Sequence, residues 1–450
     1  MKHTLKASAA ILLVFLLAVL CLPLCTAVGV EFDILNPYEN VDWAKARPCR
    51  TQLHSHTTAS DGENTLAEMV EVYYAAGYDC LAVTDHEVVD RGWVKPNYKP
   101  IETFFSNLFS PRKEIKGLSA ERLAEITAGE GRDGRGMIRV PLGIEHGGTP
   151  MLHVNSWFAD WGSAFPPGFY EYSVAIRGVD STGGLSMINH PISAYDNYDI
   201  PYAQLFETEN VSYVYKVQRM LEEYDSLIGS ELCTPHDRKL WDVLLKNLAP
   251  SGRNIFVTAT DDSHDAQWVD GDWVVALMPE NTAGNLYDSL KSGAFFACSH
   301  YLETPDVLEY LSENAGLEIQ EYEGWRYWLA GEEDPPEPMV TEVAAEDGVI
   351  SIAAENTRAI LWIADGRIVA EGNEINLAEH IGEIGAYVRA ELWGEGGMLY
   401  TQPFLLSYEG MPAGRPVPDD YRDWGDVTAF LRMLMYPFVF VLDKLWEMIR

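Results

Sequence analysis

Between about residues 48 and 305 the chain repeats one pattern: a short apolar run ends in polar, metal-capable residues, and a helical or irregular segment follows. The runs are Arg50–His56, Cys80–His86, Val140–His146, Leu185–His190 and Asn254–His264. Strands that alternate with helices predict a mostly parallel sheet or a barrel. In such folds the carboxyl ends of the strands carry the chemistry, and the polar residues gather at those ends here.

The segments between the runs have helical spacing. Leu66, Met69, Val70 and Tyr73 predict a helix over Thr65–Ala76, with Gly77 as its stop. Further helices are predicted at Val211–Leu227, at Lys239–Leu248 and at Asn285–Lys291, the last of which is closed by a glycine.

Histidines and acids at the strand ends form a candidate metal centre. His54 and His56 are two residues apart, so on a strand both imidazoles project from one face and can share an ion. Asp262 and His264 repeat this spacing. The full set of candidate ligands is His54, His56, Asp61, His86, Glu145, His153, His190, Asp262 and His264.

Burying these groups together without cations would leave unpaired polar atoms and clustered negative charge. One Zn²⁺ needs roughly four protein ligands, so nine candidates indicate two or three divalent ions. Imidazole with carboxylate suits Zn, Mn or Fe.

The motif order HSHTTASDG, TDHE, GIE, NHP and DDSH resembles the PHP (polymerase and histidinol phosphatase) family of metal-dependent phosphoesterases. The likeness covers about residues 48–305 and is closest to exported or stand-alone members with a C-terminal β extension. It implies a distorted (β/α)7 TIM-like barrel with a two- or three-metal site on the nine residues above. His146 is an alternative to His153 as a metal ligand, and Glu207 or Glu209 is an alternative to His190.

Metal-activated water would attack a phosphate ester in line. We predict catalytic roles for His86, Asp85 and Asp262. Asp85 either orients His86, or holds a ligand water, or caps its strand. Glu87 is expected to be solvated.

The charge balance constrains the partners. The chain has 32 Lys and Arg against 68 Asp and Glu, a formal net charge of −36. This argues against binding to a nucleic-acid backbone, which depends on Lys and Arg. A small anionic substrate is compatible, because bound cations reverse the local field.

Three functions follow from these features. The first is hydrolysis of a small phosphate ester. The second is hydrolysis of an amide or carboxyl ester at the same metal-dependent site. The third is a non-catalytic exported protein that binds carbohydrate or peptide. The chain has no H-E-x-x-H, G-x-S-x-G or P-loop motif, so zincin proteases and α/β-hydrolases have no support.

The two ends of the chain suggest its location. Residues 1–27 have a basic start and a long apolar run, which predicts a signal peptide or an uncleaved N-terminal anchor, and a secreted or envelope-associated protein. Residues 28–305 form the predicted barrel domain. Residues 306–408 have short alternating runs separated by turns, which predict a small antiparallel β-sandwich.

Residues 409–450 form a tail with an amphipathic helix over Val427–Arg450. That helix either docks on the protein's own surface, lies on a membrane surface or mediates self-association. Outside the leader only four cysteines remain, which is not a disulfide framework.

Overall fold

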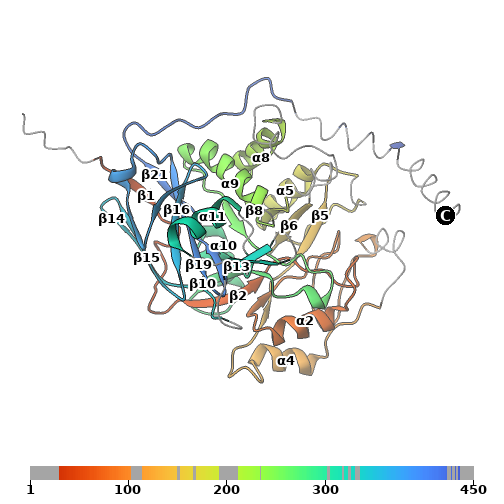
Figure 1. Ribbon diagram of the computed structural model, residues 1–450. Helices are drawn as coiled ribbons and strands as arrows, with labels where there is room; N and C mark the ends of the chain where they lie inside the picture. Colours follow the sequence, from red (N-terminus) through yellow and green to blue (C-terminus); the bar gives the residue numbers. More distant parts are fainter. Residues whose placement is uncertain are drawn as a thin grey trace, which may run out of the picture.

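The computed structural model describes residues 30–102, 114–148, 153–165, 169–191, 211–233, 235–301, 305–316, 319–322, 326–329 and 335–422, with 427, 431, 434 and 435. Within these residues the fold is mixed α/β, as predicted. Figure 1 shows helices on the outside of several sheets, with the C-terminal strands gathered on one side.

The largest sheet begins from three short parallel strands, β2 (Arg47–Gln52), β3 (Cys80–Leu81) and β4 (Ile138–Arg139). On the other side of β2 the sheet continues antiparallel through β10 (Asp272–Met278) and β11 (Phe295–Ser299). It then runs on through β20 (Gly397–Tyr400), β19 (Tyr387–Gly394), β21 (Phe404–Ser407) and β1 (Asp33–Leu35). The hairpin of β16 (Ala359–Ala364) and β17 (Arg367–Glu371) joins it at β19.

A second sheet holds five strands in sequence order: β5 (Ile144–Gly147), β6 (His153–Trp157), β7 (Leu185–Asn189), β8 (Leu227–Glu231) and β9 (Phe256–Thr258). The first three are antiparallel to one another, and the last three are parallel. The buried runs of the sequence therefore do form strands.

The two sheets meet at single bridges and do not close into a continuous barrel ladder. Ser55 bridges Ser263, and His86 bridges Glu145, both in the parallel sense. Two of the residues at these ends, Asp262 and His190, have positive φ of 45° and 25°. A strand cannot continue through that conformation, so the ladders stop where the polar residues begin. The distorted TIM-like barrel that we expected is not evident in the described residues, where two open sheets are linked by two isolated bridges.

The predicted helices form, with shifted ends. They are α2 (Leu66–Ala75), α8 (Val211–Glu223), α9 (Pro235–Leu248) and α10 (Ala283–Ser292). A capping box between Thr65 and Glu68 starts α2, and Gly293 with φ +81° ends α10. The helix predicted to reach Leu227 stops earlier, because Leu227 begins β8 and pairs with β7. Two helices were not predicted from the sequence: α4 (Ala120–Ala128) and α5 (Tyr172–Asp180).

The C-terminal strands share a core with the first sheet. β14 (Met339–Glu346), β15 (Val349–Glu355) and β18 (Glu374–Asn376) form a separate antiparallel sheet. Its buried Val343 and Ile352 belong to the same apolar cluster as Trp362 and Leu392 of β16 and β19. Because β20 pairs with β11, hydrogen bonding continues across the predicted boundary at 305. The division into domains stays a prediction.

Smaller elements complete the described chain: α11 (Pro305–Tyr310), a π-helical turn at Leu311–Ala315, and the hairpin of β12 (Ile319–Tyr322) and β13 (Arg326–Leu329). Three-residue or four-residue 3₁₀ turns lie at Ala249–Ser251, Ala266–Trp268 and Leu377–His380. Cys49, Cys80, Cys233 and Cys298 are free thiols.

The predicted leader, residues 1–27, lies outside the described residues, as does most of the predicted terminal helix. In the part of the chain that the structure describes, no helix combines the length and the apolar character that crossing a bilayer requires.

Candidate metal centre

The segment that follows β2 delivers the first two ligands. His54 and His56 are fully buried, and their Nε2 atoms lie 3.1 Å apart. The predicted spacing therefore places both rings on one side. The chain then turns back at residues 57–62, because Gly62 packs on the backbone of His56 and Thr57. A Cβ at Gly62 would lie only 2.7 Å from Thr57 N, so a larger residue would open the turn.

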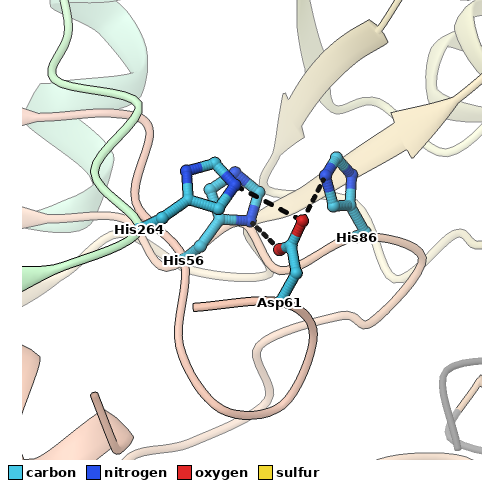
Figure 2. Close-up of side chains that lie close together, drawn as sticks. All are labelled: His56, Asp61, His86 and His264. Atoms are coloured by element: carbon cyan, nitrogen blue, oxygen red, sulfur yellow. Dashed lines mark ion pairs between the residues drawn. The ribbon is translucent and has the colours of Figure 1, made fainter. Parts of the chain in front are cut away.

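This turn carries Asp61 to a half-exposed group of three imidazoles (Figure 2). Asp61 Oδ1 lies 3.5 Å from His56 Nδ1. Asp61 Oδ2 lies 3.4 Å from Nε2 of both His86 and His264. The four side chains come from three separate stretches of the chain, so only the tertiary fold assembles them.

A second group lies deeper and shares His56 with the first. Nε2 of His54 and of His56 lie 3.1 and 3.2 Å from Asp262 Oδ1. The same nitrogens lie 3.3 and 3.1 Å from Glu145 Oε2. All four ligand atoms fall within 4.8 Å of one another.

The third group extends from Glu145 to β6. The Glu145 carboxylate lies 3.1 Å from His86 Nδ1 and 2.9 Å from His153 Nδ1. His190 Nε2 adds a contact of 3.4 Å to Glu145 and one of 4.0 Å to Asp262. The structure therefore gathers all nine candidate ligands, and Glu145 touches five of the six histidines among them.

Three buried atoms of this cluster make no well-directed hydrogen bond among the described residues, although ring nitrogens and carboxylate oxygens lie 2.9 to 3.3 Å apart there. They are Glu145 Oε2, His153 Nδ1 and Asp262 Oδ1. Leaving such atoms unpaired is costly, and a metal ion is the partner that imidazole nitrogen and carboxylate oxygen share. The donor set therefore fits divalent ions bound in three overlapping groups.

Charge within the cluster is balanced between acids and imidazoles. Burial alone would lower the pKa of His56, but the carboxylates of Asp262 and Glu145 raise it to about 10. Burial likewise opposes charge on His190, and Glu145 raises that pKa to about 9. Burial disfavours the Glu145 carboxylate too, yet the histidines around it hold its pKa well below the usual range. Divalent ions would take the place of these protons.

Glu231 is a buried acid of the site, and it was not predicted from the sequence. Its Oε1 lies 2.9 Å from His54 Nδ1 and accepts a hydrogen bond from Thr260 Oγ1 at 2.8 Å. Its Oε2 accepts from the backbone N–H of His190 at 3.2 Å. The signal was present in the sequence, because Leu227–Glu231 is one more apolar run that ends in a metal-capable residue.

His146 is not part of the cluster. Its Nε2 pairs with Ser156 Oγ at 2.8 Å, and burial lowers its pKa to about 3. Because β5 and β6 are antiparallel, His153 lies opposite Gly147 and reaches Glu145, so His153 holds the place for which His146 competed. Glu207 and Glu209, the competitors of His190, lie outside the described residues.

Asp85 supports the loop that leads to Asp61. It accepts hydrogen bonds from Thr57 N and Oγ1, both at 2.7 Å, and from Ser60 Oγ at 2.7 Å. These contacts match the capping alternative, and a catalytic role for Asp85 stays a prediction.

The expectation of a solvated Glu87 is wrong. This residue is buried and accepts hydrogen bonds from Gly147 N, Ser163 Oγ and Tyr170 OH, and burial raises its pKa to about 7. With φ at 59° its side chain turns inward, which strand alternation does not predict.

No family model and no curated protein matches the chain. Solved structures to which it is similar include a two-domain protein from Bacteroides vulgatus that contains a predicted PHP-like metal-dependent phosphoesterase. That similarity has 14% identity and a TM-score of 0.39, over 81% of this chain and 88% of that one.

Two further structures cover about half of the chain. PsfC from Pseudomonas syringae is 15% identical over 54% of this chain and 88% of its own, with a TM-score of 0.32. An amidohydrolase from Chromobacterium violaceum, with bound sulfate and no metal, is 14% identical over 48% and 87%, with a TM-score of 0.28. At these TM-scores the similarity does not indicate a function for this chain. The function is inferred below from the residues of the site.

Proposed function

We propose that this protein is a metal-dependent hydrolase that cleaves a small phosphate ester at a cluster of two or three divalent ions, Zn, Mn or Fe. One observation carries the proposal. Three ligand groups overlap in pairs, at His56, His86 and Glu145, and buried ligand atoms among them make no well-directed hydrogen bond within the described residues.

The depth of the groups suggests where substrate enters. His54, His56 and Glu145 are buried, whereas Asp61 and His264 have 47% and 40% of their side chains exposed. Substrate would therefore approach from the side of Asp61 and His264, and the buried group would keep a structural hold on its ion. His86 is partly exposed and belongs to both the outer group and the third group, so it links the two.

Divalent ions bound here would supply an activated water and neutralise the charge that develops on the ester oxygens. The protein's own part is to hold and orient. Asp262 Oδ1 faces His54 and His56, and we assign to the other oxygen of this carboxylate, Oδ2, the orientation of the attacking water. His264 is the most exposed imidazole of the outer group, and we assign to it the contact with the leaving oxygen.

The substrate's negative charge would be bound mainly by the ions. Among the described residues, the carboxylates of Asp61, Glu145 and Asp262 form ion pairs only with histidines. Arg91 is nearby in sequence, but it pairs with Glu102 and Asp160. Binding of a phosphate ester should therefore depend on metal occupancy more than on any Arg or Lys contact.

We also propose, from the sequence alone, that the chain is exported and either secreted or held at the cell envelope by residues 1–27. The finer descriptions of the fold, a distorted barrel and a C-terminal β-sandwich, belong to this proposal as well. The apolar core shared by β15 and β16 supports the second of them.

The test is elemental analysis of the purified full chain, followed by a panel of phosphoester, amide and carboxyl-ester substrates. We expect two or three ions per chain and phosphoester hydrolysis that a chelator abolishes and added metal restores. His56→Ala should lower the rate by at least about 100-fold, because His56 belongs to two groups. If the metal-loaded protein hydrolyses only amides or carboxyl esters, the second proposed function replaces the phosphoesterase. If the protein binds no metal and retains a glycan, the non-catalytic binding function replaces the hydrolase.

A further inference from the structure

A second aspartate lies next to the ligand Asp262 and has a different environment. Asp261 Oδ1 accepts hydrogen bonds from the backbone N–H groups of Gly271 at 2.8 Å and Asp272 at 2.9 Å. Its Oδ2 accepts from Asp270 N and Tyr73 OH, both at 3.0 Å, and from a glutamine amide at 2.8 Å. Five donors occupy the two oxygens, so Asp261 has no free lone pair of good geometry for an ion.

The amide that reaches Asp261 belongs to Gln52, at the end of β2. Gln52 is fully buried, and its Oε1 accepts from the backbone N–H groups of Leu53 at 2.9 Å and His54 at 3.0 Å. One side chain therefore joins the backbone of a metal-ligating histidine to the carboxylate beside a metal-ligating aspartate.

This network spans the junction between the two sheets. His54 follows β2 in the first sheet, and Asp262 follows β9 in the second, where Ser55–Ser263 is the bridge between the two segments. Asp262 also has φ at 45°, which a residue other than glycine adopts only when its surroundings hold it there. The contacts of Asp261 to the segment 270–272, to α2 and to β2 hold one side of it, and the backbone hydrogen bond from His56 N to Ser263 O holds the other.

We propose that Asp261 and Gln52 are positioning residues that fix Asp262 Oδ1 at 3.1 Å from His54 Nε2 and so set the affinity of the buried ligand group for its ion. This inference rests on the proposed metal centre. It adds that the two adjacent aspartates of the D-D-S-H motif have separate tasks: Asp262 binds the ion, and Asp261 binds the protein.

The test measures the affinity of the chelator-treated full chain for Co²⁺, which is monitored by visible absorption. The thermal midpoint of unfolding is measured for the same variants. Asp261→Asn keeps the shape but turns an N–H₂ group toward donors that need an acceptor. We expect affinity for the tightest ion to fall by about 10- to 100-fold, the range for residues that orient metal ligands. The Co²⁺ spectrum should change, since the ligand geometry relaxes.

Asp79→Asn is the matched control. Asp79 is also a buried carboxylate, and it accepts from the backbone N–H of Arg50 at 2.9 Å and from Arg135 Nε at 2.7 Å. It stands just before β3, at the opposite end of the strands from the ligands. This variant should lower the unfolding midpoint and leave the Co²⁺ affinity within about 2-fold of wild type, because no ligand depends on it.

A reciprocal exchange tests the pair itself. In the double variant Gln52→Glu with Asp261→Asn, the new amide can donate to the new carboxylate, while the other oxygen of Glu at 52 still accepts from residues 53 and 54. We expect the double variant to bind Co²⁺ more tightly than either single variant. Should Asp261→Asn not fold, Tyr73→Phe removes a single donor from Asp261 and should weaken Co²⁺ binding less than 10-fold but measurably.

Equal Co²⁺ affinities for Asp261→Asn and Asp79→Asn, or no recovery in the double variant, would overturn the positioning role. A wild-type chain that binds Co²⁺ and hydrolyses no substrate would refute the proposed hydrolase and leave this inference intact. If the wild-type chain binds no Co²⁺, both the proposed metal centre and this inference are refuted.

Discussion

The carboxylate of Glu231 lies 2.9 Å from Nδ1 of His54, and both side chains are buried. In this arrangement the imidazole donates its Nδ1 proton to Glu231. Nε2 faces Asp262 and Glu145, and a divalent ion bound there would take the place of its proton. A metal-ligating histidine is commonly held this way, because the partner carboxylate fixes both the tautomer and the direction of the ring.

Glu231→Gln should weaken the binding of the most buried ion by about 10- to 100-fold, since an amide oxygen is a poorer acceptor for the Nδ1 proton than a carboxylate. Competition between the protein and a chromogenic chelator measures this affinity. The matched control is Thr260→Val, which removes another hydrogen bond to the same oxygen of Glu231 without touching His54. Similar losses in the two variants would contradict the orienting role.

His56→Ala and His153→Ala should differ in the number of ions that they lose. His56 belongs to two ligand groups, whereas His153 belongs to one. We expect the metal content per chain to fall by about two ions for His56→Ala and by about one for His153→Ala. Elemental analysis after dialysis against metal-free buffer gives the count, and the same count for both variants would speak against a shared ligand at His56.

Asp90→Asn should change how stability depends on pH. Burial raises the pKa of Asp90 from 3.8 to about 6, despite the Arg139 guanidinium 3.7 Å away. Because the folded-state pKa lies above the unfolded one, the stability linked to the protonated acid is full below pH 3.8 and is lost as the pH rises through about 6.

Asparagine does not ionise, so the variant escapes that loss. The unfolding free energy of Asp90→Asn relative to wild type should therefore rise between about pH 4 and pH 7, by at most about 3 kcal/mol. Urea titrations of chelator-treated protein at several pH values test this. A difference that stays constant over this range would show that Asp90 keeps an ordinary pKa.

Arg389→Met should destabilise the fold without changing metal content. Arg389 is fully buried and binds Asp242 of α9 through Nε at 2.9 Å and through Nη2 at 2.8 Å. Removing one partner of a buried ion pair leaves an unpaired charge and costs about 3–5 kcal/mol.

The matched exposed pair is Arg358–Glu395, whose arginine side chain is 58% exposed. Arg358→Met should cost no more than about 1 kcal/mol. Denaturant unfolding of both variants gives the comparison. Equal costs would mean that the Arg389 pair contributes no more than a surface pair does.

Much of the candidate site could be read from the sequence because its signal is local. An apolar run that ends in His, Asp or Glu predicts a strand and its functional end at once. The structure brings together in one cluster the residues at or just after these ends, with Asp61 from the turn that follows the first run. Their binding of metal stays a prediction. The strand Leu227–Glu231 was not predicted, because the helix predicted from Val211 ended at Leu227 and the acid that follows has no histidine beside it.

Other features depend on partners far away in the chain. Alternation along a strand cannot show that Glu87 turns inward at positive φ, or that Asp261 faces five donors while its neighbour Asp262 faces two imidazoles. The two single bridges that replace a closed ladder also depend on long-range pairing. Pairing of β20 with β11 joins segments about a hundred residues apart, for which no local pattern gives the register.

The sequence by itself determined which residue types stand at the strand ends, and the number of imidazoles and acids among them predicts cations nearby. The tertiary structure decided their grouping, because distances between side chains on different strands depend on how the sheets meet. It also separated the ligands from the residues that hold them, since a carboxylate is free to bind an ion only where no protein donor already occupies it.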